Sequence, residues 1–149
     1  PDVEVVYPVH LSPVVRECAF PILGGHDRIH LIDPVDVEEM HNLISRCYMV
    51  MTDSGGLQEE APALGKPVLV MRRETERPEA ITAGTAKLAG VEKNEIVRLA
   101  NELLDNPDAY ASMAKAVNPY GDGHASERIV QAILWHFGRT AERSADFGA

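Results

Sequence analysis

The sequence has little cysteine. Its 149 residues include two, Cys18 and Cys47, which lie far apart and form no CxxC pair. We therefore expect reduced thiols, as is usual for cytoplasmic proteins, rather than a disulfide. A chain of this length can bury a sizeable apolar core as one domain, so neither a disulfide nor a metal is needed to hold it together.

Positive charge is also scarce. The chain has 14 lysines and arginines against 23 aspartates and glutamates, which gives a formal net charge of -9. Because phosphate backbones and anionic membranes are bound by clustered basic residues, we expect neither nucleic acid nor a membrane surface as a partner. The sequence also lacks an apolar run as long as a membrane span, and its start does not resemble a signal peptide. These absences predict a soluble, cytoplasmic protein.

The sequence does not begin with methionine. The stretch VEVVYPV, which has the pattern of a buried strand, starts within three residues of the amino terminus. Excised domains often begin in this way. We therefore expect the chain to be part of a longer polypeptide.

Short apolar runs rich in β-branched residues alternate with helical patterns along the chain. Each run is typical of a strand buried on both faces of a parallel sheet. The expected strands cover residues 3–9, 29–32, 48–52, 67–71 and 86–89, and the expected helices cover residues 13–23, 36–47, 56–64, 78–83, 92–104, 107–117 and 126–137. The alternation predicts an α/β fold with an open, doubly wound parallel sheet in residues 1–138, followed by a flexible tail of residues 139–149.

The stretch TDSGGLQEEAPALGKPVLV carries the first candidate site. Ser54 can serve as the N-cap of a helix that follows a strand, and Gly55 and Gly56 leave the backbone N–H groups open to a ligand. A phosphate at this point meets unpaired donors and the positive end of the helix dipole. The loop therefore predicts an anion site at the carboxyl end of the sheet.

Two adjacent glutamates follow on the same helix. Glu59 and Glu60 point about 100° apart, so at most one of them faces a ligand beside the loop. Glu60 lies roughly 9 Å along the helix from Ser54, about the reach from a pyrophosphate to a ribose. Ordinary surface glutamates on a solvated helix start explain the pattern equally well, and no G-x-G-x-x-G motif supports a dinucleotide. Pro62 is expected to bend or shorten the helix.

The next strand end carries three arginines, Arg72, Arg73 and Arg77, on the same expected edge of the sheet. A guanidinium group can bind two phosphate oxygens at once. A charged loop with internal pairs of arginine and glutamate is the alternative. Seen alone, this loop favours the alternative.

Three segments carry a resemblance to a known family. The long stretch DSGGLQEEAPALGKPVLVMRRETERPEAITAGTAKLAG, together with VVYPVHLSP and NPYGDGHAS, closely resembles the carboxy-terminal half of bacterial, non-hydrolysing UDP-N-acetylglucosamine 2-epimerases. The match spans nearly the whole chain up to the tail. It implies the second Rossmann-like domain of a glycosyltransferase-B-like fold, with a nucleotide sugar held in the cleft between the two halves.

The resemblance also implies roles for individual residues. Ser54, Gly55 and Gly56 would hold the pyrophosphate, Glu60 would accept from the ribose hydroxyls, and Arg77 would contact the ligand. In DPVDVEEMHNL, Val35 would offer backbone contacts to the uracil. Met40 stands where relatives carry an aromatic residue, which would make that contact weaker.

His10 of YPVH matches a histidine that lies beside a second, activating substrate molecule in bacterial members. The alternative is a strand-end histidine whose ring is satisfied by the backbone. His26 and His30 straddle a turn and a strand rather than one helix face, so no metal site is expected.

The family reaction inverts carbon 2 of the sugar by eliminating UDP and adding it back, and it needs no redox cofactor. The family takes its acid and base residues, including a histidine in a THRREN-type motif, from sequence upstream of Pro1. No catalytic residue is therefore expected in this chain, which would carry the UDP-binding half, be inactive alone and need an amino-terminal half as its partner. The family further implies a homodimer, and the helix at residues 126–137 could dock onto the other half. A glycosyltransferase domain and a non-catalytic nucleotide-sugar-binding module are the alternatives.

Overall fold

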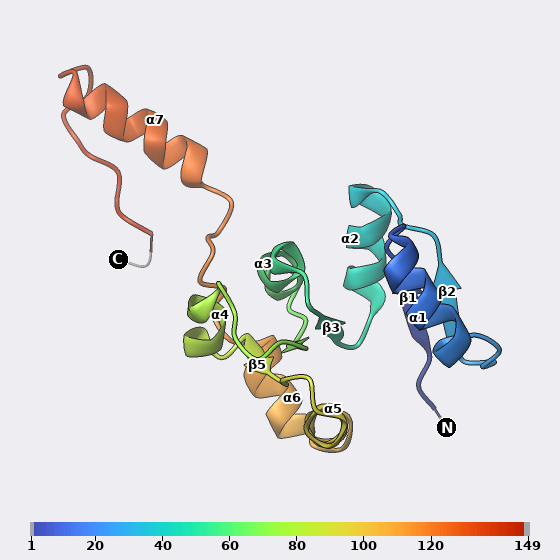
Figure 1. Cartoon of the computed structure of the whole chain (residues 1–149). Helices are drawn as coiled ribbons and strands as arrows, with labels where there is room; N and C mark the ends of the chain where they lie inside the picture. The colour runs from blue at the N-terminus through green and yellow to red at the C-terminus, as the bar shows by residue number, and fades with distance from the viewer. Residues whose placement is uncertain (1, 148–149) are drawn as a thin grey trace. The chain divides into compact units, whose positions relative to one another are not determined.

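The computed structural model describes residues 2–147. Its internal contacts divide the chain into two compact units, the first ending at Leu43 and the second beginning at Ile44. Figure 1 traces both units from the amino to the carboxyl terminus.

The first unit is a small parallel β-α-β arrangement. It contains β1 (Val5–Pro8), α1 (Pro13–Leu23) and β2 (Ile29–Ile32), and the helix α2 (Val37–Arg46) begins in it. Val5 pairs with Ile29 and Pro8 pairs with Ile32 in a parallel register. A parallel pair requires a crossover connection, and α1 supplies it.

The prediction that every strand is buried on both faces is wrong for β1. The side chains of Val5 and Val6 are 46% and 47% exposed. A two-stranded sheet in this unit has too few covering elements to shield both of its faces. In the second unit, by contrast, all three residues of β4 are buried.

The second unit contains a three-stranded parallel sheet and most of the helices. Its strands β3 (Val50–Thr52), β4 (Val68–Val70) and β5 (Ala86–Leu88) lie in the order β3-β4-β5. Val50 pairs with Val68, which in turn pairs with Ala86. The helices are α3 (Gly55–Ala63), α4 (Pro78–Ala83), α5 (Lys93–Asp105), α6 (Pro107–Ala114) and α7 (Ala125–His136).

The core of the second unit forms between the sheet and the pair α5 and α6. Leu99 and Leu103 lie four residues apart on one face of α5, and they pack with Leu69 of β4 and Met113 of α6. The side chain of Asn106 accepts hydrogen bonds of 3.1 Å from two backbone N–H groups in the first turn of α6. This cap ends α5 and starts α6, so the two helices can fold back over the sheet.

The predicted elements are confirmed, with ends that differ by a few residues. The strands nevertheless form two parallel sheets rather than one, because alternation along a sequence predicts parallel strands without saying which strands pair. Pro62 lies in the last turn of α3, which ends at Ala63. The helix has 9 residues, as many as the expected range, so the bend or shortening expected from Pro62 stays a prediction.

The carboxy-terminal part is α7 and the segment after it. α7 has no fully buried residue and exposes apolar side chains that include Ile129, Ile133 and Trp135. The segment that follows has no helix or strand as far as residue 147, and its Ser144 hydroxyl donates to the carbonyl of Arg128 at 3.2 Å. The predicted tail ends at residues 148 and 149, which lie outside the described part. Its flexibility, and docking by α7, stay predictions.

Across residues 2–147, no helix is both long enough and apolar enough to cross a membrane.

Candidate functional site

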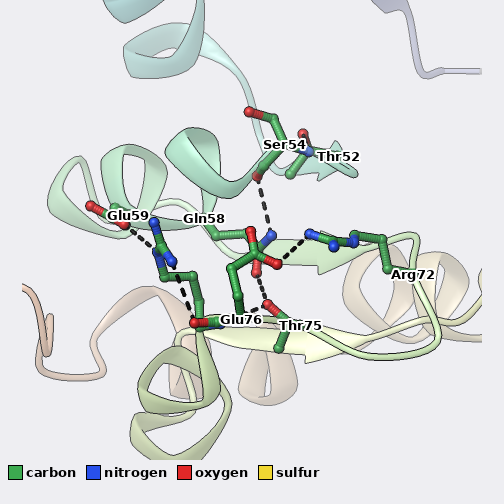
Figure 2. Close-up of polar contacts among 8 residues, drawn as sticks. Thr52, Ser54, Gln58, Glu59, Arg72, Thr75 and Glu76 are labelled. Atoms are coloured by element: carbon green, nitrogen blue, oxygen red, sulfur yellow. Dashed lines mark hydrogen bonds and ion pairs between the residues drawn. The ribbon is translucent and has the colours of Figure 1, made fainter.

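The candidate site lies at the carboxyl ends of β3 and β4. Because the two strands are parallel neighbours, the loop after Thr52 and the loop after Val70 leave the same edge of the sheet. The first loop leads at once into α3, and the second runs through Arg72 and Thr75 to α4. Figure 2 shows that Gln58 and Glu59, on α3, point toward the side chains of the second loop.

Ser54 is the N-cap residue of α3, as predicted, but its side chain does not cap the helix. Its backbone N–H instead donates to the hydroxyl of Thr52 at 2.9 Å. The Ser54 side chain therefore leaves the N–H groups of the first turn available, and a helix start of this kind suits an anion.

The two glycines leave the space beside the start of α3 free of side chains. A Cβ on Gly55 would lie 2.5 Å from Oε1 of Glu76, and a Cβ on Gly56 would lie 3.4 Å from Oε1 of Glu60. Neither glycine has a positive φ. Space above the backbone, rather than an unusual backbone conformation, is what these positions require.

The adjacent glutamates separate as predicted, because they point to different sides of α3. The carboxylate of Glu59 accepts a hydrogen bond from Nε of Arg77. Glu60 turns its carboxylate back toward Gly56, since side chains on a helix tilt toward its amino terminus. Its carboxylate therefore lies closer to the loop than the distance along the helix axis suggests.

Each of the three arginines of the second loop is in an ion pair. Arg72 pairs with Glu76 at 2.5 Å, Arg73 with Glu92 at 3.4 Å, and Arg77 with Glu59. A hydrogen bond from its own backbone lowers the pKa of Glu76, and Arg72 acts in the same direction. Only the pair of Arg72 and Glu76 is internal to the loop, because Glu59 lies on α3 and Glu92 lies after β5. The alternative interpretation, a charged loop with internal pairs, therefore accounts for one of the three ion pairs.

Arg77 differs from the other two arginines in where its guanidinium points. Its Nε donates to Glu59 and its Nη1 donates to the carbonyl of Glu76 at 3.4 Å. Its Nη2 lies 4.0 Å from the point where a Cβ on Gly55 would stand. The hydrogen bond to Glu59 raises the pKa of Arg77, so the group stays charged beside the start of α3.

Sequence reasoning missed two residues that link the loops, Gln58 and Thr75. Gln58 is completely buried, and its side chain bonds to the carbonyl of Ser54 and to the hydroxyl of Thr75. A signal was present, because Gln58 shares a helical face with the buried residues Ala61 and Pro62. A polar residue on such a face needs hydrogen-bonding partners.

Tyr120, in the NPYGDG stretch, was also missed as a neighbour of the site. Burial raises the pKa of its phenol, and the negative charges of Glu79 and Glu59 act in the same direction. Arg77 acts on the phenol in the opposite direction. The backbone of Ala80, beside the phenol, acts on its pKa in the same direction as Arg77.

The remaining predicted residues belong to the first unit or to the part of α2 inside it. Val35 is half-buried in the segment between β2 and α2, and Met40 is half-buried on α2. His10 is exposed just after β1, and its Nδ1 accepts a hydrogen bond of 3.1 Å from the N–H of Ser12. This is the backbone contact expected of a structural histidine, so an activator role stays a prediction.

Among the residues that the structure describes, no group of three or more His, Cys, Asp or Glu side chains is arranged to hold a metal ion.

Parallel strands joined by helices, with a glycine loop and a guanidinium at one strand edge, define a Rossmann-like α/β protein with a site suited to an anionic ligand. The family is more specific than this class. The chain belongs to the UDP-N-acetylglucosamine 2-epimerase family, whose sequence model matches residues 1–134.

Individual relatives agree with the family model. The chain is 56% identical over 146 residues to the UDP-N-acetylglucosamine 2-epimerase of Bacillus subtilis (strain 168), a match that covers 98% of this chain and 38% of that protein. It is 52% identical over 132 residues to the enzyme of the same name from Escherichia coli (strain K12), covering 89% of this chain and 35% of that protein. The chain thus spans well under half the length of these relatives.

Solved structures show the same fold. The S. aureus MnaA–UDP co-structure superposes with a TM-score of 0.90 at 52% identity, covering 99% of this chain and 40% of that one. The UDP-GlcNAc 2-epimerase of Neisseria meningitidis bound to UDP-GlcNAc gives a TM-score of 0.83 at 45% identity, covering 89% of this chain and 36% of that one. The predicted α/β fold of the glycosyltransferase-B-like type is confirmed.

Proposed function

We propose that this chain supplies the UDP-binding half of a UDP-N-acetylglucosamine 2-epimerase. In this proposal Ser54, Gly55 and Gly56 hold the pyrophosphate, Arg77 contacts it, and Glu60 accepts from the ribose hydroxyls. Val35 and Met40 contact the uracil. The relatives solved with UDP and with UDP-GlcNAc support the choice of ligand.

The observation that carries the proposal is the position of the Arg77 guanidinium. Its Nη2 reaches to within 4.0 Å of the Cβ position of Gly55, beside a helix start that the Ser54 side chain does not cap. A fixed positive charge next to unpaired backbone donors suits a pyrophosphate. Because the chain as a whole carries a charge of -9, an anionic ligand depends on such local positive charge.

The same groups would also assist the reaction. In an elimination of UDP, negative charge builds up on the departing phosphate. Donors that are already in place stabilise that charge more in the transition state than in the ground state. Carboxylates or histidines upstream of this chain would move the protons, so we expect no epimerisation by the 149-residue chain alone.

UDP titration of the chain, followed by calorimetry or NMR, tests the proposed site. Glu60→Ala is expected to weaken UDP binding by about 1–3 kcal/mol, because ribose hydroxyls lose a charged acceptor. The same change should leave binding of inorganic pyrophosphate as it was. Glu74→Ala, at an exposed position of the neighbouring loop, is the matched control. Absence of UDP binding by the unmodified chain would show that the proposed function is wrong.

Epimerase and glycosyltransferase predict different fates for the proton on carbon 2 of the sugar. In deuterated water, a longer protein that contains this chain should replace that proton of UDP-N-acetylglucosamine with deuterium if it is an epimerase. A transferase or a binding module would not. The match of the epimerase model to residues 1–134 supports exchange.

The proposed partners follow from the family. An amino-terminal half would complete the cleft, and two copies would form a homodimer in the cytoplasm. Exposed apolar residues on α7, among them Ile133 and Trp135, are available for docking. Substrate at a second site beside His10 would be the activator.

A further inference from the structure

Gln58 lies inside the fold although it is polar. Its side chain is 0% exposed, so it cannot itself be reached from solvent. A carboxamide buried without partners would destabilise the fold, and Gln58 avoids this with two hydrogen bonds. Its Nε2 donates to the carbonyl of Ser54 at 3.2 Å, and its Oε1 accepts from the hydroxyl of Thr75 at 2.5 Å.

Thr75 continues the connection to Arg77. Its hydroxyl accepts a hydrogen bond of 3.0 Å from the backbone N–H of Arg77. The donors therefore run in one direction, from the Arg77 N–H through Thr75 and Gln58 to the Ser54 carbonyl. We call these three hydrogen bonds the Gln58 bridge. Hydrogen bonds aligned in this way polarise one another, so each strengthens the next.

The Gln58 bridge joins the two loops that carry the proposed ligand contacts. One end is the peptide of Ser54, immediately before Gly55, and the other is the peptide of Arg77. The side chains that form the bridge come from α3 and from the loop after β4, as Figure 2 shows. Thr52, itself nearly buried, holds the N–H of Ser54 at 2.9 Å. Both backbone groups of Ser54 are thus held by side chains from the interior.

We propose that Gln58 and Thr75 are positioning residues for binding of a nucleoside diphosphate, an inference that rests on the proposed function. In this proposal neither side chain contacts the ligand itself. The bridge holds the start of α3 and the Arg77 backbone in one fixed relation, so that backbone donors and guanidinium meet the same pyrophosphate. Ser54 is exposed and Arg77 is only half-buried, so packing alone constrains them little. A site needs such support from behind to hold its geometry.

Substitutions at Thr75 test the proposal, because this residue is only half-buried and its change disturbs the core less than a change at Gln58. Thr75→Val keeps the shape but removes the hydroxyl, and Thr75→Ser keeps the hydroxyl. Thr75→Val removes two of the three hydrogen bonds of the bridge. Because this loss reaches the ligand only through positioning, we expect it to weaken UDP binding by about 3-fold to 10-fold, within the range of a single hydrogen bond. Thr75→Ser should stay within about 2-fold of the unmodified chain.

The affinity for uridine separates positioning from a general effect on the fold. Uridine lacks phosphates, so its weak binding, followed by NMR titration, should be the same in Thr75→Val and in the unmodified chain. Thr82→Val is the matched control, because the Thr82 hydroxyl donates to the carbonyl of Pro78 within α4 and is outside the bridge. It should change neither affinity. The thermal midpoint of each variant is measured alongside.

The outcomes are distinct. If UDP and uridine weaken equally, or if Thr75→Val binds UDP as tightly as the unmodified chain, the positioning role is refuted while the proposed function stands. If the unmodified chain fails to bind UDP, both are refuted. Should Thr75→Val not fold, the pair Thr75→Ala and Thr75→Ser supplies the same comparison of chains with and without the hydroxyl.

Discussion

Replacing Arg77 with alanine removes the positive charge nearest the start of α3. A hydrogen bond to a charged group contributes about 1.5–3 kcal/mol. The Arg77 side chain is 34% exposed, so solvent screens part of this interaction. In the unliganded chain it is also engaged by Glu59, whose hydrogen bond a phosphate must replace or share. We therefore expect an effect at the lower end of the range for charged hydrogen bonds, roughly a 5-fold to 30-fold increase in the UDP dissociation constant.

Calorimetric titration with UDP at low and at high salt measures this loss. The difference between Arg77→Ala and the unmodified chain should shrink as salt rises, because screening weakens interactions of partly exposed charges. Arg77→Lys should fall between the two, since lysine restores the charge without the planar fork of donors.

Arg73→Ala is the matched control. Arg73 lies on the same loop but is 78% exposed and pairs with Glu92. Its loss should change UDP affinity by less than about 2-fold, as expected for an exposed ion pair. The reasoning is refuted if Arg77→Ala binds UDP as well as the unmodified chain does. It is refuted equally if Arg73→Ala loses as much, because the effect would then come from net charge.

Three further predictions concern a close approach, the core and an ion pair. Gly55→Ala should weaken UDP binding by about 1–3 kcal/mol, because its methyl group would fill the approach to the loop. The thermal midpoint should change little, because the Glu76 carboxylate that the methyl group meets at 2.5 Å is exposed and can move. Leu103→Ala should lower the free energy of unfolding in urea by about 2–5 kcal/mol, because the residue is fully buried in the core. The hydrogen bonds from Arg128 lower the pKa of Asp122. This ion pair should therefore stabilise the start of α7 at pH values above the ordinary aspartate pKa of about 3.9, and its contribution should be lost as the pH falls toward the lowered pKa. Circular dichroism of the unmodified chain and of Asp122→Asn, measured against pH, follows this loss.

The Leu103 prediction has a control variant, and the other two have outcomes that would refute them. Leu104→Ala, at the exposed neighbour of Leu103, should cost far less than Leu103→Ala. The Gly55 prediction fails if UDP affinity is unchanged, and also if the chain unfolds, since the structure leaves room for the carboxylate to move. If the helix signal of Asp122→Asn is as sensitive to acid as that of the unmodified chain, the ion pair does not stabilise α7.

Much of the local structure could be predicted from patterns that span a few residues. The alternation of apolar runs and helical faces predicted every strand and helix of residues 2–147, with ends that differ by a few residues. The burial of β1 was predicted wrongly. A run of valines indicates a strand, but whether its faces are covered depends on elements elsewhere in the chain.

For the candidate site, too, some residues could be recognised from sequence and some contacts could not. Ser54, Gly55 and Gly56 could be recognised because residue type and position along the chain suffice to indicate a helix start with open backbone. The partner of Arg77 could not, because Glu59, Glu76 and Glu92 were all available in sequence. Side-chain geometry decides which carboxylate a guanidinium meets.

The sequence by itself determined the order and type of the elements, the membership in the epimerase family and the placing of an anion-suited loop after β3. Only the tertiary structure decided that the five strands of residues 2–147 form two sheets, that Glu59 holds Arg77, and that a buried Gln58 ties Ser54 to Thr75. The physical reason is one of distance along the chain. Helix starts and strands arise from interactions among neighbours, whereas Gln58 and Thr75 are 17 residues apart and meet only because β3 and β4 pair side by side.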